Sequence, residues 1–407
     1  MNIYMKRSFK SCFLAALVAT FMMSACNGGV QPDGSLQITN KDVINLESSF
    51  ENNFLESWEY FFLEDDNPDA FMGDINGILY DDGIFFLFSG QYMGDSKLKA
   101  FDAQGHFLND IGRVGRARDE YLHVSDWAIN TTDNEILALD NFAQEIKRYS
   151  YSGEFLGQIP VAPTKPTDGF LEADFVKHLS NGSIIEYGGL AIIPSYDCFM
   201  LGKDGKRYSP FEMTDYRQYC EMDPMEYLRM TGDVGGAMFT TAFSNVLSDT
   251  TYLVRLLDNH IYRLANDNVE CLANMAFLPE MPLKMKRNYD FQEDDVYDGH
   301  TIPNFFYDMK DYLYLWYYYD DEYLFEKSTS KMYHMTHDTL NVSIPDIGPI
   351  TICDNTIIGC VSDYYAGKAL KLMDSPDYDH RYTPELEALY RKVATHENAA
   401  IVIAHFK

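Results

Sequence analysis

The sequence predicts an all-β protein, a six-bladed β-propeller of four-stranded antiparallel blades with a short C-terminal helix. Three observations predict it: a repeated strand–turn–strand unit, many short runs of β-branched and aromatic residues, and almost no helical periodicity before residue 360. Short strands repeating every forty to sixty residues are typical of propeller blades. Residues 36–407 divided among six blades leave about 62 residues for each. Five or seven blades are the alternative counts.

The repeat is clearest between residues 101–108 and 149–156, which are offset by 48 positions. Gly105 aligns with Gly153, and the aromatic and aliphatic residues on either side align as well. Each copy is predicted to be a strand, a turn at the glycine and a second strand. Residues 136–140 and 145–149 form another predicted hairpin between them. Fainter copies begin near residues 200, 260 and 327.

The C-terminal part predicts one helix and one closing strand. Thr383 is a good N-cap, Pro384 suits the first helical position, and an apolar stripe follows. The strand at residues 400–406 is expected to complete a blade with strands from the N-terminal part, which would hold the ring closed.

The N-terminus predicts export and lipid attachment. Residues 1–25 have basic residues ahead of a short apolar stretch, which is typical of a secretory signal peptide. The apolar stretch is too short for a permanent membrane span. Small residues precede Cys26 as in a bacterial lipobox, so Cys26 is the expected lipidation site; an ordinary signal peptide with an incidental cysteine is the alternative. The predicted domains are the signal peptide (1–25), a polar tether (26–35) and the propeller (36–407).

Composition limits the partners. The chain has 62 Asp and Glu against 32 Lys and Arg, a formal charge of −30, so nucleic acid is not an expected partner. The five cysteines of the mature chain (198, 220, 271, 353 and 360) show no disulfide framework and no paired zinc motif. Buried structural cysteines are therefore expected.

With these residues in view, the chain resembles the six-bladed β-propeller lipoproteins of Bacteroidetes, which are related to the NHL-repeat propellers. The resemblance rests on residues 101–159, where a Phe-Asp-x-x-Gly turn is followed by Ile111-Gly-Arg-Val-Gly115 and then by Glu120-Tyr121. Ala117, Arg118 and Asp119 stand where that family has Gly-Pro-Gly. The resemblance implies a propeller fold and a location in the cell envelope, as an outer-membrane lipoprotein facing the periplasm or the cell surface.

Two groups of residues are candidate ligand-binding sites. Arg113, Arg116 and Arg118 lie in one glycine-bearing loop, and guanidinium groups bind carboxylates, sulfates and phosphates well. The alternative is a structural loop whose arginines pair with nearby acids. Tyr314, Trp316 and Tyr318 lie in the richest aromatic segment and could stack on sugar rings or peptide side chains. Core packing between blades is the alternative there.

No catalytic residue, metal site or cofactor is expected. The acidic stretches 64–69 and 293–298 do not have the spacing of an EF-hand loop, and solvated loops are the alternative to calcium binding. His334 and His337, three residues apart, would point to opposite faces of a strand. The sequence contains no nucleophile elbow, phosphate-binding loop or dinucleotide motif.

The expected fold and the expected location in the cell envelope together favour a binding or recognition module for an envelope protein or glycan. The alternative is an NHL- or lactonase-like metal-dependent hydrolase or lyase with its site in the central channel. An accessory role in a nutrient-uptake system is a third interpretation.

Overall fold

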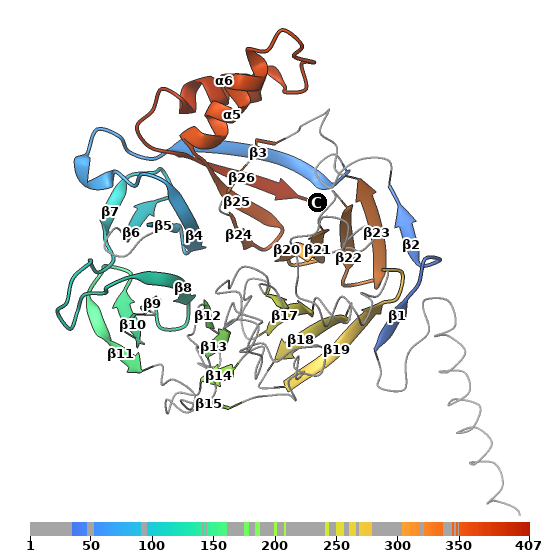
Figure 1. The fold of residues 1–407 in the computed structure, drawn as a ribbon, viewed down its shortest axis with the longest axis horizontal. Coiled ribbons are helices and arrows are strands. Elements are labelled where there is room, and N and C mark those ends of the chain that lie inside the picture. Colours follow the sequence, from blue (N-terminus) through green and yellow to red (C-terminus); the bar gives the residue numbers. More distant parts are fainter. Residues whose placement is uncertain are drawn as a thin grey trace, which may run out of the picture.

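A computed structural model of the chain describes residues 35–46, 53–90, 96–140, 142–143, 145–160, 175–178, 184–187, 199–201, 207–208, 241–243, 250–255, 260–265, 268–278, 303–317, 321–336, 344–345, 347–348 and 350–407. In these residues the protein is all-β with few helices. The described strands form six sheets, four with four strands and two with five. Figure 1 shows the sheets in a propeller-like arrangement around a common centre.

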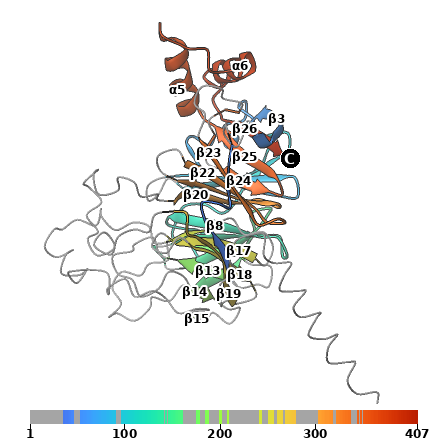
Figure 2. The same cartoon turned by 90° about the vertical axis from the view of Figure 1, so that its right-hand side faces the viewer.

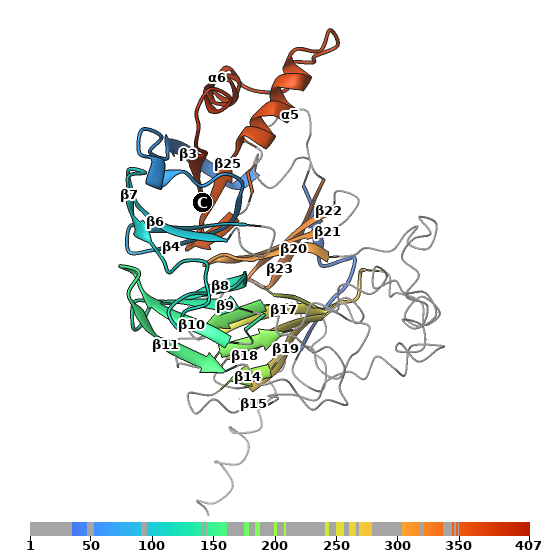
Figure 3. The ribbon, with the colours of Figure 1, turned by 60° about the vertical axis from the view of Figure 1, so that its left-hand side comes forward.

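Two four-stranded antiparallel sheets come first after the N-terminal segment. Their strands follow each other in sequence from the inner edge to the outer edge, and the two sheets lie side by side (Figures 1 and 3). Their strands are β4 (Ile75–Asp81), β5 (Ile84–Ser89), β6 (Lys97–Asp102), β7 (Phe107–Asp110), β8 (Val124–Asn130), β9 (Glu135–Asp140), β10 (Glu145–Ser150) and β11 (Phe155–Pro160).

Three further sheets repeat this order. In each, four consecutive strands pair antiparallel. They are β12 (Phe175–His178), β13 (Ile184–Tyr187), β14 (Phe199–Leu201), β15 (Arg207–Tyr208), β16 (Thr241–Phe243), β17 (Thr250–Arg255), β18 (His260–Ala265), β19 (Asn268–Met275), β20 (Pro303–Asp308), β21 (Tyr312–Tyr317), β22 (Asp321–Glu326) and β23 (Lys331–Thr336).

The sixth sheet joins the two ends of the chain, as the sequence predicts. Its first three strands are C-terminal: β24 (Ile350–Cys353), β25 (Thr356–Val361) and β26 (Ala400–Phe406). Its outer strand is the N-terminal β3 (Leu55–Phe62), which pairs antiparallel with β26 from Ala400↔Phe62 to Phe406↔Leu55. The expected pairing of residues 400–406 with an N-terminal strand is confirmed.

Two short N-terminal strands correct the prediction of uniformly four-stranded blades. β1 (Leu36–Ile38) pairs in parallel with β19, and β2 (Val43–Asn45) pairs in parallel with β23. Each is a fifth strand on an outer edge, where it covers backbone groups that an open edge would expose. Ile38 is almost fully buried between the two sheets. Strands of three residues are too short to show the alternation that predicts a strand.

The repeated glycines lie where the outer hairpin of one sheet meets the outer strand of the preceding sheet. Gly105 has φ +88° and Gly153 has φ +81°. A Cβ atom on Gly153 would lie 2.2 Å from the carbonyl oxygen of Asp110, and one on Gly105 would lie 2.3 Å from that of Phe62. The repeat therefore reflects a close backbone contact between neighbouring sheets, and the predicted turn at each glycine is confirmed.

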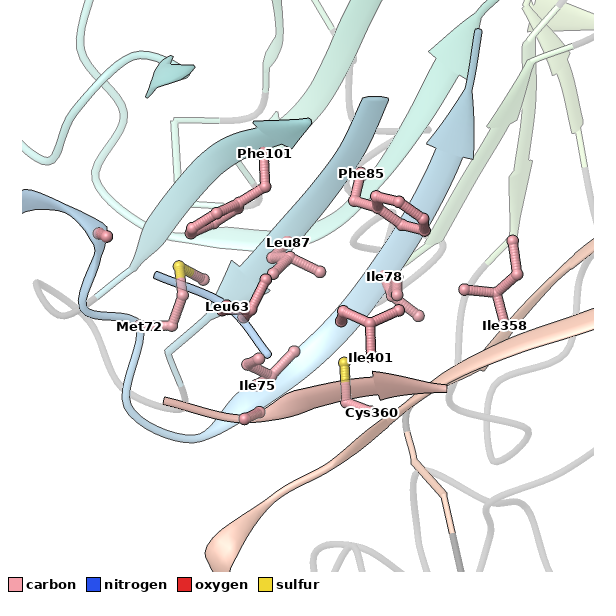
Figure 4. Close-up of a cluster of buried hydrophobic side chains, with 12 residues drawn as sticks. Leu63, Met72, Ile75, Ile78, Phe85, Leu87, Phe101, Ile358, Cys360 and Ile401 are labelled. Carbon is pink, nitrogen blue, oxygen red and sulfur yellow. The ribbon is translucent and has the colours of Figure 1, made fainter. Parts of the chain in front are cut away.

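Apolar clusters fill the spaces between neighbouring sheets. Figure 4 shows one of them, in which Phe85, Leu87 and Phe101 from the β4–β7 sheet face Cys360 and Ile401 from the sheet of β24–β26. The cluster is built from alternate residues of each strand, since side chains along a strand point to opposite faces. Both faces of these strands are covered, which explains their continuous apolar runs.

Two helices, rather than the one predicted, lie between β25 and β26. The predicted helix is α6 (Pro384–Val393), in which the Thr383 hydroxyl accepts a hydrogen bond from the backbone of Leu386 and Leu386, Leu389, Tyr390 and Val393 are buried. The second helix, which the sequence did not predict, is α5 (Asp363–Met373). Both pack on Trp58, Tyr60 and Phe62 of β3, outside the sheets (Figures 1 and 2). None of the helices formed by the described residues is long and apolar enough to span a membrane.

Candidate binding face

The strand order places certain loops together at one end of the sheets. In a four-stranded antiparallel meander, the connection into the first strand and the turn between the second and third strands lie at the same end. We call this the connection end; its described residues are 63–74, 90, 96, 111–123, 142–143 and 362–399. The loops that join separate sheets therefore lie at this end, and the α5–α6 insertion leaves and re-enters its sheet here, although its helices pack outside β3. Binding residues of many proteins lie on such loops.

Residues 111–123, the connection that carries the three arginines, fold into a fixed loop. Val114 and Tyr121 form an isolated β-bridge, supported by a hydrogen bond of 3.1 Å from the Tyr121 amide to the Arg113 carbonyl. The Glu120 carboxylate accepts from the Ala117 amide and from Arg113 Nε, each at 2.8 Å. The hydrogen bond from Ala117, followed by that from Arg113, lowers the pKa of Glu120. The side chain of Glu120 thus performs part of the turn-forming role that glycines would have had there.

Buried groups beneath the loop hold it on the β8–β11 sheet. The hydroxyl of Tyr149 donates to the Asp119 carbonyl at 3.1 Å, and Lys147 Nζ donates to the Arg118 carbonyl at 3.2 Å. Tyr149 is fully buried against the ring of Tyr121, and this burial raises the pKa of the Tyr149 hydroxyl. Side-chain hydrogen bonds therefore hold the loop in which Ala117, Arg118 and Asp119 replace the Gly-Pro-Gly of the similar family.

The three arginines have different surroundings. Arg113 pairs with Glu120 although its side chain is 74% exposed. The guanidinium carbon of Arg118 lies 5.9 Å from the ring centroid of Phe155. Arg116 is exposed, and its guanidinium neither pairs with a carboxylate nor stacks on a ring among the described residues. The structure thus pairs Arg113 with Glu120 of the same loop, places Arg118 near Phe155 of β11 and leaves Arg116 available to a ligand.

Phe142 lies in the β9–β10 turn beside this loop and is 56% exposed. The fully buried carboxylate of Asp140 accepts from the Leu122 amide at 2.6 Å and from the Ala143 amide at 3.0 Å, which fixes the turn to the loop. The ring of His123 packs edge-on against Phe142 with 5.6 Å between centroids. Nδ1 of His123 is buried and has no hydrogen-bond partner among the described residues. Phe142 is not among the binding residues predicted from the sequence; the signal for it was an aromatic residue inside a predicted turn.

Phe71, in the connection between β3 and β4, is a second exposed aromatic residue at the connection end. Lys97 Nζ lies 5.2 Å from its ring centroid. Asn398 holds the connection, since its amide donates to the Ala70 carbonyl at 3.2 Å and its oxygen accepts from the Met72 amide at 3.2 Å. Lys97 opens β6 beside Ser96, whose hydroxyl accepts from the Val124 amide at 3.3 Å, so hydrogen bonds link this region to the neighbouring sheet.

Tyr364, in the first turn of α5, is the third exposed aromatic residue at this end, with 66% of its surface exposed. Its ring contacts that of Tyr365, with 5.4 Å between centroids. Helix α5 begins two residues after β25 ends, so Tyr364 lies close to the connection end of the sixth sheet.

The aromatic segment 312–318 contributes mainly to the core. Tyr314 is 6% exposed and packs among residues of the β20–β23 and β24–β26 sheets, so it cannot stack on a ligand in this structure. Trp316 is partly buried against the same cluster. Tyr318 lies outside the described residues. For Tyr314 the structure corrects the ligand-binding hypothesis in favour of core packing, because both faces of β21 are covered.

The acidic and histidine candidates have local structural partners. Glu64 accepts from the Phe107 amide at 2.8 Å, and Asp65 lies 2.9 Å from Nδ1 of His396. His334 stacks on Tyr323. Residues 293–298 and His337 lie outside the described residues. Among the residues that are described, no three His, Cys, Asp or Glu side chains are grouped so that they could hold a metal ion.

The described cysteines are free thiols. Cys271 and Cys353 are partly buried, and Cys360 is fully buried in the cluster of Figure 4. Burial raises the pKa of the Cys360 thiol, and an apolar site of this kind makes a thiol unreactive. Cys26, Cys198 and Cys220 lie outside the described residues.

Comparison with known proteins agrees with the fold. The profile of a family described as a domain of unknown function, DUF4934, matches residues 37–405. A solved structure from Bacteroides fragilis, described as a "putative exported protein", is 13% identical with a TM-score of 0.63, and the match covers 90% of this chain and 99% of that one. A member of the DUF4221 family from Bacteroides vulgatus is 8% identical with a TM-score of 0.54, covering 87% and 97%. At these identities the likeness shows the fold alone. No curated protein matches the chain.

Proposed function

The chain belongs to the DUF4934 family, and from its fold and its connection end we propose that it is an exported, lipid-anchored binding module that recognises a protein of the cell envelope. The binding surface in this proposal is the connection end. The rigid sheets hold its loops in place, and the loops supply the contacting side chains.

One observation carries the proposal. Six large apolar side chains of the described residues are exposed, and the aromatic ones lie in a different part of the fold from the aliphatic ones. Phe71, Phe142 and Tyr364 are aromatic and all lie at the connection end, whereas the aliphatic ones lie on outer strands. Exposed aromatic side chains cost little conformational entropy when they become ordered at an interface, and they are enriched at binding hot spots. The aliphatic side chains are Ile44, Leu108 and Leu156.

A protein partner fits this surface better than a glycan. The three aromatic residues come from three separate connections, and the free Arg116 lies in a fourth. Such a dispersed set suits a broad protein interface with several anchors. A glycan site would instead need polar side chains converging on one pocket.

Export and lipid attachment belong to the same proposal. The signal-like residues 1–25 and the lipobox-like Cys26 support it, as does the description of the B. fragilis structure as an exported protein. The described sheets also support a closed six-bladed ring: the inner strands β24 and β4, β4 and β8, β8 and β12, and β16 and β20 are in contact. The strand exchange between β3 and β26 would complete the ring.

The test is a pull-down of the tagged mature protein from its own membranes in mild detergent, followed by mass spectrometry. We expect one envelope protein in stoichiometric amount. Phe71→Ala together with Phe142→Ala should reduce its recovery at least tenfold, since each side chain is an exposed anchor. The matched control is Leu108→Ala together with Leu156→Ala, which removes exposed apolar side chains from outer strands and should leave recovery unchanged.

Recovery that is equal in both double variants would show that the connection end is not the binding surface. A partner-free sample that retains a defined oligosaccharide would replace the protein with a glycan. Metal analysis of the same sample tests the enzyme alternative, since a stoichiometric metal ion without a partner would favour a channel-site hydrolase or lyase.

A further inference from the structure

We draw no further inference here: the strongest candidate, the outer edge of strand β11 beside the exposed side chain of Leu156, pairs with no other strand among the described residues, and nothing in that part of the structure shows what covers it.

Discussion

Replacing Gly153 with alanine tests the contact between neighbouring sheets. The backbone at Gly153 has φ +81°, a conformation that costs an L-residue about 1–2 kcal/mol. The new Cβ would also lie 2.2 Å from the Asp110 carbonyl oxygen, so a shift of more than 1 Å is needed to reach an ordinary contact of about 3.4 Å. Overpacking of this kind costs about 1–3 kcal/mol. Loss of backbone freedom in the unfolded chain returns about 0.4–1 kcal/mol. Taken at the middle of these ranges, the terms give a net destabilisation of about 3 kcal/mol.

Gly83 provides the matched control. Its φ is +79°, nearly the same, but a Cβ there would meet nothing within 4 Å. Gly83→Ala should therefore lose only the backbone term, about 1 kcal/mol after the unfolded-state correction. The assay is urea unfolding of the purified mature protein, followed by tryptophan fluorescence. Gly105→Ala should behave like Gly153→Ala, since its Cβ would lie 2.3 Å from the Phe62 carbonyl oxygen.

Equal destabilisation by Gly153→Ala and Gly83→Ala would refute this reasoning. It would mean that the turn has room to move away from Asp110 and that the repeated glycines serve backbone conformation alone. If Gly105→Ala lowers the free energy of unfolding no more than Gly83→Ala does, the turn at Gly105 likewise has room to move away from Phe62.

Four further predictions concern separate parts of the molecule. Burial raises the pKa of Asp308 from 3.8 to about 6 despite its ion pair with Lys327, so the folded state binds more protons than the unfolded state between these pH values. The free energy of unfolding should therefore fall by up to about 3 kcal/mol as pH rises from 4 to above 6. In urea titrations, Asp308→Asn should flatten that fall. Thr383→Ala should destabilise the protein by about 1 kcal/mol by removing the cap of α6, whereas Thr383→Ser should not, as judged by denaturant midpoints. Glu120→Gln should increase amide hydrogen exchange in residues 113–120, because the ion pair with Arg113 is lost; unchanged exchange would show that the loop is held from below alone. Cys26→Ala should move the protein from the membrane fraction to the soluble fraction without changing its Tm, and unchanged fractionation would contradict lipid attachment.

The sequence predicts structure best at positions where a local conformation and a tertiary contact both require the same residue type. The glycines at 105 and 153 repeat because each hairpin turn meets a neighbouring backbone, so their spacing revealed the sheet-to-sheet arrangement. Thr383 and Pro384 mark the start of α6 because capping is a local property of three or four residues.

Features that depend on distant contacts could not be predicted in this way. β1 and β2 are strands only because β19 and β23 offer open edges more than two hundred residues later. Helix α5 begins after Ser362, whose side chain makes no capping bond, and it contains Gly367. Its signal was the spacing of the buried Ala366, Ala369 and Met373, which the preceding apolar strand obscured.

The surroundings of the candidate residues could not be predicted from the sequence. The sequence marks the connection with the three arginines as a distinctive loop, but it does not show that Glu120 and Phe155 contact two of them. The aromatic neighbourhood of Tyr314 suggests ligand binding, whereas packing between sheets accounts for it. Exposure decides between these interpretations, and exposure depends on which sheets become neighbours.

The pairing of β3 with β26 sets an order of events for biosynthesis. β3 leaves the ribosome more than three hundred residues before its partner β26. Until residues 400–406 arrive, the apolar residues of β3 lack both their strand partner and the helices that cover them. Closing so long a loop late slows folding. The sheet of β24–β26 and β3 therefore forms only after β26 has been synthesised, and the apolar face of β3 stays uncovered until then.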